Sequence, residues 1–246
     1  MPAITVKMQG GFGNQVMQWL WAKGYAERHG FDFLCEPWLG STVFDLDDKQ
    51  PWSGATDLPG RSSETLVDGE GDVRLEGYGQ DQRSVTYTRK QARAWLQISP
   101  KAMSLIPKSW VTTWLNDQGL VAHRRVGDYV GYGYPIVSKE SYFRAAKKFA
   151  LPGALQMVSD EYMRLVPSVP AEFSFLPDFL RLLNAKYLLR GDSTFSWVAG
   201  LLGHAKVFSP VVGHLGAGEH DVEFVEGNWP RISHQPCCTD MHVREQ

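Results

Sequence analysis

The sequence predicts an α/β protein with two Rossmann-like, doubly wound parallel-sheet domains that face a cleft, the N-terminal one being reduced. Two observations predict this class. A short apolar run, Ile4–Met8, leads through clustered glycines into a helical pattern. From Leu120 to Val212, apolar runs of strand length alternate with helical patterns, which is typical of parallel sheets covered by helices. We place the domains at residues 1–117 and 118–246 of the 246-residue chain.

The individual elements follow from apolar runs for strands and a 3.6-residue apolar period for helices. In the N-terminal half we expect strands at Ile4–Met8, near Phe33 and at Asp72–Leu75, and helices after Gly13, at Gln91–Leu105 and at Trp110–Gln118. Residues Asp48–Gly71, rich in Gly, Ser, Asp and Pro, are expected to form an irregular loop. In the C-terminal half we expect strands at Leu120–Ala122, Gln156–Val158, Tyr187–Leu189 and Lys206–Phe208, and helices at Lys139–Phe149, Phe175–Asn184 and Phe195–Leu202.

The turn between the first strand and the first helix contains Gly11 and Gly13. Glycines there let backbone N–H groups approach a ligand, and the helix N-terminus favours negative charge or oxygen ligands. Asn14 and Gln15 add amides that suit a hydroxyl-rich ligand, beyond what a plain tight turn needs. A dinucleotide fingerprint would need a third glycine where Val16 stands, and the Gly-Lys-Ser/Thr of a P-loop is absent.

Charged residues follow the apolar strand Leu120–Ala122. His123, Arg125 and Asp128 come at its carboxyl end and lead into a glycine-containing loop. Arginine suits a diphosphate because its planar, permanently charged guanidinium makes two parallel bonds to phosphate oxygens. Arg124 occupies the adjacent strand position, so we expect it to point away from Arg125. The pattern favours a phosphate site over a solvated pair of arginines.

Two more strand ends carry candidate ligand groups. After Tyr187–Leu189, a turn leads into a helix whose first residues offer hydroxyls and free N–H groups, which suit a phosphate as well as an N-cap. These candidate ligand residues are Ser193, Thr194, Phe195 and Ser196, with Ser193 or Thr194 as the N-cap. After Gln156–Val158, Asp160 is expected to contact the base or ribose of a nucleotide, or to form a solvated acid pair with Glu161.

Composition narrows the class of function. The chain has 25 Lys and Arg against 27 Asp and Glu, a formal net charge of −2. Nucleic-acid binding needs a clustered positive surface, so it is not expected as the main function. No apolar run reaches membrane-spanning length, and the N-terminus lacks the pattern of a signal peptide. We expect a cytoplasmic protein without a membrane span.

No metal site is predicted. Cys35, Cys237 and Cys238 are an odd number with one adjacent pair, which is no disulfide framework. The cluster of His234, Cys237, Cys238 and His242 lacks a standard zinc spacing. An Asp-x-Asp pattern in Asp45–Asp48 is short and reads better as a solvated acidic turn.

Four segments, in order, resemble motifs of the family 11 glycosyltransferases, the α-1,2-fucosyltransferase family. They are GGFGNQ at Gly10–Gln15, LEGYGQD at Leu75–Asp81, LVAHRRVGDYV at Leu120–Val130, and DSTFSWVAGLL at Asp192–Leu202. The third is similar to the H-x-R-R-G-D-Y motif shared by α-1,2- and α-1,6-fucosyltransferases. The resemblance covers residues 4–212, with one departure: Val126 stands where the family has its second arginine.

The resemblance implies the GT-B fold, with 1–117 as the acceptor-side domain and 118–246 as the nucleotide-sugar domain. It implies an inverting, metal-independent glycosyltransferase that moves L-fucose from GDP-fucose to a glycan hydroxyl in α-1,2 linkage. Arg125 falls on the arginine that contacts the donor phosphates, and charge on the leaving diphosphate would be stabilised there and by N–H groups around Ser193–Phe195. The acceptor contacts expected from the second motif are Glu76, Tyr78, Gln80 and Asp81. The general base is open among Glu76, Asp81, Asp128 and His123.

Three alternatives stay open. The loss of the second arginine is compatible with another nucleotide sugar, such as a UDP-, dTDP- or different GDP-sugar. The nine tryptophans and the short chain are compatible with a non-catalytic sugar-binding module. The first glycine loop, with Glu36 as a ribose ligand, is compatible with an enzyme that binds NAD or S-adenosylmethionine. Oligomeric state and acceptor identity do not follow from the sequence.

Overall fold

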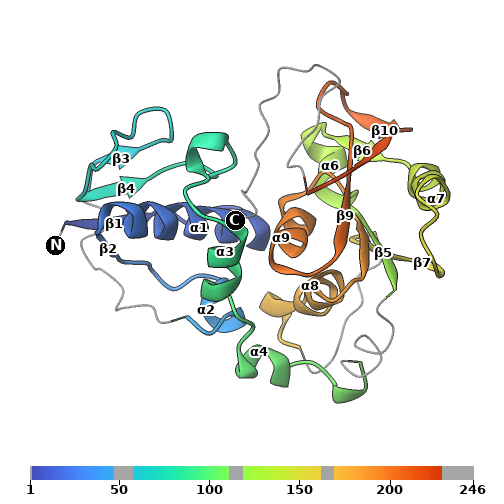
Figure 1. Cartoon of the computed structure of the whole chain (residues 1–246), viewed down its shortest axis with the longest axis horizontal. Coiled ribbons are helices and arrows are strands. Elements are labelled where there is room, and N and C mark those ends of the chain that lie inside the picture. Colours follow the sequence, from blue (N-terminus) through green and yellow to red (C-terminus); the bar gives the residue numbers. More distant parts are fainter. Residues whose placement is uncertain (1, 47–57, 111–118, 162–168, 229–246) are drawn as a thin grey trace. The chain divides into compact units, whose positions relative to one another are not determined.

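The computed structural model describes residues 2–46, 58–110, 119–161 and 169–228. The chain divides into two compact units, unit 1 with Met1–Ala102 and unit 2 beginning at Met103 (Figure 1). Each unit contains its own parallel sheet. The boundary expected between residues 117 and 118 lies outside the described residues.

Unit 1 is built on a four-stranded sheet in the order β2-β1-β4-β3, with every neighbouring pair parallel. Its strands are β1 (Ala3–Val6), β2 (Asp32–Phe33), β3 (Gly60–Arg61) and β4 (Val73–Leu75). The chain passes from β1 through helix α1 (Phe12–His29) to β2 on one side, and β4 then lies on the other side of β1. The strand order therefore reverses at β1, where later strands are added on its other side.

Helix α1 is buried on more than one face, so it has no single apolar stripe. Trp21 is 1% exposed and packs into a core with Ile4 and Leu75 of the sheet. Trp19 is 2% exposed and stacks on Trp38 with 6.3 Å between ring centroids. Gly30 ends the helix in the left-handed conformation at φ 72°, which glycine adopts at low cost. α1 is the central element of unit 1.

The remaining helices of unit 1 correct one prediction. They are α2 (Gly40–Val43), the 3₁₀ turn η2 (Gln82–Ser84), α3 (Arg89–Trp95) and α4 (Pro100–Ser104). The continuous helix expected at Gln91–Leu105 is wrong, because α3 ends at Trp95 and α4 begins at Pro100. Proline disfavours the helical conformation of the preceding residue. Ser99 instead pairs its N–H with the Val43 carbonyl, and its hydroxyl accepts from Ala102 N–H.

Four other expectations concern residues that the structure describes only in part or not at all. The loop expected over Asp48–Gly71 contains β3 in its described portion, because Gly60 and Arg61 pair with β4. The helix expected at Trp110–Gln118 lies outside the described residues except for Trp110, and so does the second Asp of the Asp-x-Asp pattern. So does the His and Cys cluster near the C-terminus.

Unit 2 contains a five-stranded sheet in the order β11-β9-β8-β5-β7. Its strands are β5 (Leu120–Arg124), β7 (Leu155–Ser159), β8 (Tyr187–Leu189), β9 (Lys206–Pro210) and β11 (Phe224–Glu226). β7, β5, β8 and β9 are parallel, whereas β11 runs antiparallel to β9. A separate parallel pair is formed by β6 (Pro135–Val137) and β10 (Gly218–His220).

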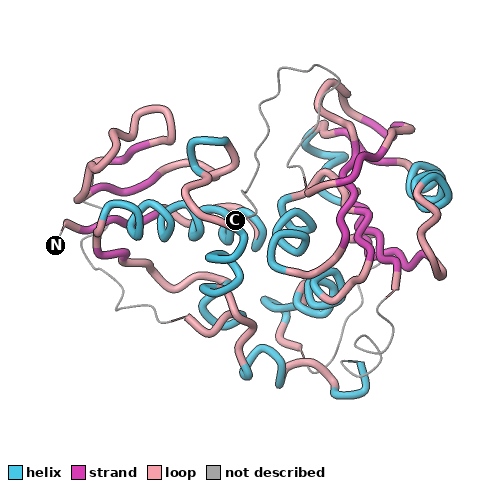
Figure 2. Tube along the Cα trace, viewed as in Figure 1, coloured by secondary structure: helices cyan, strands magenta, loops and turns pink. Residues whose placement is uncertain are grey.

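Helices cover both faces of the large sheet in unit 2 (Figure 2). The described helices of unit 2 are α6 (Gly127–Tyr132), α7 (Lys139–Lys148), the 3₁₀ turn η3 (Ala171–Phe173), α8 (Leu176–Leu183) and α9 (Thr194–Leu202). α8 and α9 pack on one face and α7 on the other (Figure 1). Tyr142 of α7 is fully buried against Leu189 and Phe208 of the sheet. The doubly wound arrangement predicted from the sequence is confirmed, while α6, β6, β10 and β11 were not predicted.

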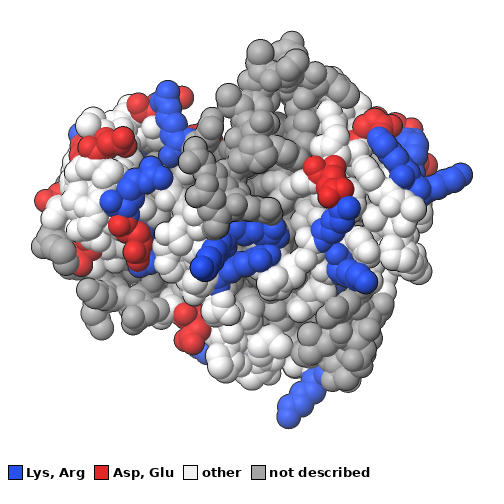
Figure 3. Space-filling model, viewed as in Figure 1, with Lys and Arg blue, Asp and Glu red and all other residues white. Residues whose placement is uncertain are grey.

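Surface charge is mixed. On the face drawn in Figure 3, small groups of Lys and Arg alternate with Asp and Glu over the described part of the chain. Within that part, no helix is both long enough and apolar enough to cross a membrane.

The glycine that follows α9, close to the C-terminal end of α8, provides a test of packing in unit 2. A Cβ on Gly203 would lie 2.5 Å from the Leu183 carbonyl oxygen and 2.8 Å from that of Ala199. Because both atoms belong to the backbone, Gly203→Ala is expected to lower the free energy of unfolding by about 1–3 kcal/mol. Urea unfolding followed by circular dichroism measures this change.

The matched control is Gly131→Ala in α6, where a Cβ would meet nothing within 4 Å. It is expected to be neutral or stabilising by up to about 1 kcal/mol, because alanine is the better helix former. Equal destabilisation by both substitutions would contradict the packing at Gly203.

Candidate functional site

The sheet of unit 2 has its switch point at β5. The chain runs from β5 to β7 on one side and then to β8 on the other. The ladder between β5 and β8 ends at Ala122 and Leu189, whereas the ladder between β5 and β7 continues to Arg124 and Ser159. Open α/β sheets bind ligands outside the carboxyl ends of the strands at such a point. The predicted residues around Arg125 and Ser193 follow these two strand ends.

Arg125 is held by two carboxylates of unit 2. Its Nε and Nη2 donate to the two carboxylate oxygens of Asp128 at 2.8 and 2.9 Å, and Nε lies 3.1 Å from Oδ2 of Asp160. Burial works against the charged form, but the hydrogen bond to Asp128 and the charges of both carboxylates raise the pKa of Arg125 above its ordinary value. The side chain is 33% exposed, and Nη1 takes part in none of these contacts.

Asp160 also shapes the loop that follows β5. Its Oδ1 accepts a hydrogen bond of 2.8 Å from the Val126 N–H. A Cβ on Gly127 would lie 2.8 Å from Oδ2 of Asp160, so glycine is needed for this close approach. Asp160 therefore contacts Arg125 and the loop backbone, rather than forming the solvated acid pair that was the alternative.

His123 is buried in β5, with 3% exposure. Its ring lies 5.4 Å from that of Phe195, and the Nδ1 atom has no hydrogen-bond partner among the described residues. Burial, together with the positive charges of Arg125 and Arg190, lowers the pKa of His123 to about 3. The buried imidazole is therefore neutral near pH 7, and with so low a basicity it is a weak proton acceptor.

The loop after β8 lies against the end of β5. The Tyr129 hydroxyl donates to the Asp192 carbonyl oxygen, and a Cβ on Gly191 would be 2.7 Å from the His123 carbonyl oxygen. Ser193 caps α9, as predicted, because its hydroxyl accepts from the Phe195 N–H at 3.3 Å.

The candidate ligand residues at the start of α9 differ in accessibility. Ser193, Thr194 and Phe195 are half-buried, while Ser196 is fully buried. The Ser196 hydroxyl donates to backbone carbonyl oxygens of the same turn. The groups that a ligand can reach are thus those of Ser193, Thr194 and Phe195.

Unit 1 brings its two predicted loops together in the same way. β1 and β4 are adjacent parallel strands, so their carboxyl ends lie at one edge of the sheet. The Gln80 amide donates to the side-chain oxygen of Asn14 at 3.0 Å. The Gln18 amide accepts from the Gln9 N–H and donates to the Gly77 carbonyl oxygen. The first glycine loop and the Glu76–Asp81 loop therefore form one surface.

The glycines of the first loop differ in conformation and surroundings. Gly10 has a φ of 75°, and a Cβ there would lie 2.5 Å from the Asn14 amide. Gly11 is exposed at the start of α1 with open space around it, whereas Gly13 is buried. Gln15 is used locally, because its amide donates to the Gly10 carbonyl oxygen and accepts from the Leu39 N–H.

The acceptor candidates differ in how their polar groups are used. Tyr78 is 48% exposed. Glu76 is 42% exposed and pairs with Arg74 at 2.7 Å. Asp81 accepts hydrogen bonds from Ser63, from the Arg83 N–H and from Ser84, and so caps the η2 turn.

Several residues of these surfaces were not predicted. They are Gln18 in unit 1 and Tyr129 and Arg190 in unit 2. Tyr129 and Arg190 carried a signal, because one belongs to the H-x-R-R-G-D-Y pattern and the other ends an apolar strand. Among the described residues, no group of three or more His, Cys, Asp or Glu side chains is arranged to hold a metal ion.

The low basicity of His123 predicts a pH dependence of stability. The folded pKa of about 3 lies below the unfolded value of 6.5, so the unfolded chain binds the proton more tightly. Stability is therefore complete above pH 6.5 and falls as the pH decreases toward 3, by up to about 1.4 kcal/mol per pH unit. His123→Gln is expected to flatten this decline in urea unfolding between pH 7 and pH 4. Parallel profiles of the two proteins would contradict a neutral, buried His123.

Comparison with known proteins identifies the fold. No protein-family model matches the sequence, and no curated protein is similar to it. NodZ α-1,6-fucosyltransferase co-crystallised with GDP matches with a TM-score of 0.57 at 12% identity, over 93% of this chain and 99% of that chain. NodZ from Bradyrhizobium matches with a TM-score of 0.55 at 12% identity, over 92% and 99% of the two chains.

A plant enzyme has the same architecture. A mutant of Arabidopsis thaliana FUT1 in complex with GDP matches with a TM-score of 0.51 at 10% identity, over 87% of this chain and 71% of that chain. The chain therefore has the α/β fold with two parallel sheets that these GT-B fucosyltransferase structures share.

Proposed function

We propose that the protein is an inverting, metal-independent glycosyltransferase that moves L-fucose from GDP-fucose to a glycan hydroxyl. The observation that carries the proposal is Arg125, a partly exposed arginine at the switch point of unit 2, in a fold shared with fucosyltransferases. NodZ has been crystallised with GDP and soaked with GDP-fucose, which supports GDP as the nucleotide.

The donor diphosphate binds between the ends of β5 and β8 in this proposal. Asp128 and Asp160 fix one edge of the guanidinium, which leaves the Nη1 edge for phosphate oxygens. Ser193 and the first N–H groups of α9 supply further donors, and the helix N-terminus favours a negative charge.

Transfer builds negative charge on the leaving diphosphate while the sugar carbon becomes oxocarbenium-like. Arg125 and the α9 N-terminus stabilise that charge more strongly in the transition state than in the bound donor. An acceptor oxygen then attacks from the opposite face, loses its proton to a base, and inverts the anomeric centre. No base is assigned among the four candidates, because Glu76 pairs with Arg74, Asp81 caps a turn, Asp128 binds Arg125 and His123 is buried.

The finer assignments rest on the sequence motifs. The α-1,2 linkage and membership of the family 11 glycosyltransferases come from the four resembling segments. Another nucleotide sugar is the second candidate, because Val126 stands where the family has an arginine. The Val126 N–H is itself bonded to Asp160. We place the reaction in the cytoplasm.

Calorimetric titration of the protein with GDP, UDP, dTDP, CMP and NAD, with and without EDTA, tests the donor site. GDP is expected to bind, with EDTA making no difference, and Arg125→Ala is expected to weaken binding about a hundredfold because a charge-assisted phosphate contact is lost. Arg144→Ala is the matched control, since Arg144 is 47% exposed on α7 and pairs with Asp221. It should bind GDP like the wild type.

The other outcomes separate the alternatives. Preference for UDP or dTDP would retain the reaction class and reject fucose as the sugar. Binding of NAD alone, or of no nucleotide, would reject the transferase and leave the cofactor enzyme or the sugar-binding module.

The surface of unit 1 predicts a separate effect on the acceptor. Gln80→Ala removes the hydrogen bond to Asn14 and is expected to raise the KM for the glycan about tenfold while the KM for GDP-fucose stays unchanged. Initial rates of GDP release with each substrate varied in turn measure both constants. An equal rise of both KM values would contradict an acceptor role of this surface.

A further inference from the structure

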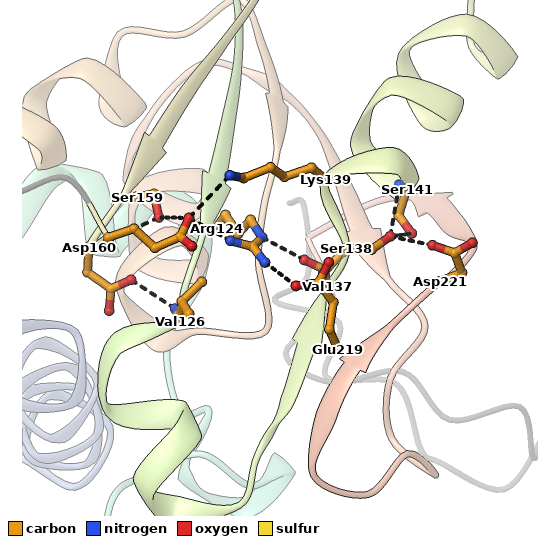
Figure 4. Close-up of polar contacts among 11 residues, drawn as sticks. Arg124, Val126, Val137, Ser138, Lys139, Ser141, Ser159, Asp160, Glu219 and Asp221 are labelled. Carbon is orange, nitrogen blue, oxygen red and sulfur yellow. Dashed lines mark hydrogen bonds and ion pairs between the residues drawn. The ribbon is translucent and has the colours of Figure 1, made fainter.

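Arg124 is a charged residue at the end of β5 to which the proposed function gives no role. Its side chain is 3% exposed, and its Nε donates to the Val137 carbonyl oxygen at 3.0 Å. Nη1 and Nη2 donate to one oxygen each of Glu161 and Glu219, at 2.6 and 2.5 Å (Figure 4). A buried guanidinium is costly unless it is paired, so these contacts strongly favour one position for each carboxylate.

Glu161 connects Arg124 to the turn after β7. Its Oε2 also accepts from the Ser159 hydroxyl at 3.4 Å and lies 3.7 Å from Nζ of Lys139 (Figure 4). Burial acts to raise the pKa of Glu161, but the hydrogen bond and charge of Arg124 and the charge of Lys139 outweigh it, and the pKa is lowered. The carboxylate is therefore ionised at neutral pH and fixed to β5.

The next residue in the turn is the one that contacts Arg125. Asp160 accepts from the Val126 N–H through one oxygen and pairs with Nε of Arg125 through the other. The ladder places Arg124 opposite Ser159. Two consecutive residues of the turn therefore contact consecutive residues at the end of β5. Glu161 contacts Arg124. Asp160 contacts Arg125 and Val126.

We propose that Arg124 is a positioning residue for the donor site. Through Glu161 it fixes the turn after β7, and the turn then places Asp160 where it orients Arg125 toward the diphosphate. The inference rests on the proposed function in taking a diphosphate as the ligand of Arg125. Glu219, the other partner of Arg124, lies on β10 and anchors the small sheet instead.

The two carboxylates provide a matched pair of variants. Glu161→Ala and Glu219→Ala each remove one acidic partner of the same guanidinium. Only Glu161→Ala is expected to release Asp160, so the Val126 amide should exchange its hydrogen about tenfold faster in that variant and at the wild-type rate in Glu219→Ala. Hydrogen exchange followed by NMR measures this without any ligand. Should Glu161→Ala fail to fold, Glu161→Gln replaces it.

GDP affinity is the second readout. If charge alone mattered, removing the negative charge of either glutamate would strengthen the binding of the GDP anion, because it weakens charge repulsion. Misplacement of Arg125 predicts the opposite, a rise of about tenfold in the Kd for GDP in Glu161→Ala and no rise in Glu219→Ala. In the Arg125→Ala background, Glu161→Ala should cause no further loss, because its effect acts through Arg125.

The outcomes are distinct. Three results would overturn the positioning role. The first is that both variants change exchange and GDP affinity equally, and the second is that the Val126 amide exchanges at the wild-type rate in Glu161→Ala. The third is that Glu161→Ala weakens GDP binding as much in the Arg125→Ala background as in the wild type. Faster exchange at Val126 in a protein that binds no GDP would support the positioning of Arg125 and reject the proposed function.

Discussion

The pairing of β5 along both of its edges is the constraint on which unit 2 depends. A strand between two parallel neighbours has its side chains directed alternately to the two faces of the sheet. His123 therefore packs beside Phe195 of α9, and Arg124 reaches the opposite side toward Val137 and Glu161. Arg125 follows where the ladder with β8 has already ended, so its side chain is only partly covered.

Burial of Arg124 has consequences for the whole carboxyl edge of the sheet. A guanidinium removed from water needs acceptors for its donors, and the residues that supply them come from β6, β10 and the turn after β7. These segments are far apart in the sequence. The contacts of Arg124 therefore join the small two-stranded sheet to the main one.

The two units use the same topological device. In each, the chain leaves the first strand for a neighbour on one side and later places another strand on the opposite side. Loops at the carboxyl ends are thereby brought together, Gly10–Gln15 with Glu76–Asp81 in unit 1 and Arg125–Asp128 with Gly191–Ser193 in unit 2. Solved fucosyltransferase structures have this fold, although only 10% to 12% of their residues are identical to those of this chain.

Much of the fold followed from the sequence because it is encoded locally. Apolar runs and helical periods located β1, α1, β5, α7 and β7 through β9. The hydroxyls before the last helix predicted Ser193 or Thr194 as its cap, and the structure has Ser193 there. The break between α3 and α4 was missed although Pro100 marks it in the sequence, and the Ser99 N–H is bonded to the distant Val43 carbonyl instead of within a helix. Strand alternation predicted that Arg124 and Arg125 differ in direction.

The partners of those two arginines were decided only by the tertiary structure. Neither Glu161 nor Glu219 has a sequence signature that links it to Arg124, since the contact depends on strand order and register. The meeting of Asn14 with Gln80 likewise requires β1 and β4 to be neighbours. Local sequence determines which residues form strands and turns, whereas the pairing of distant strands determines which charged groups share a buried space and must neutralise one another.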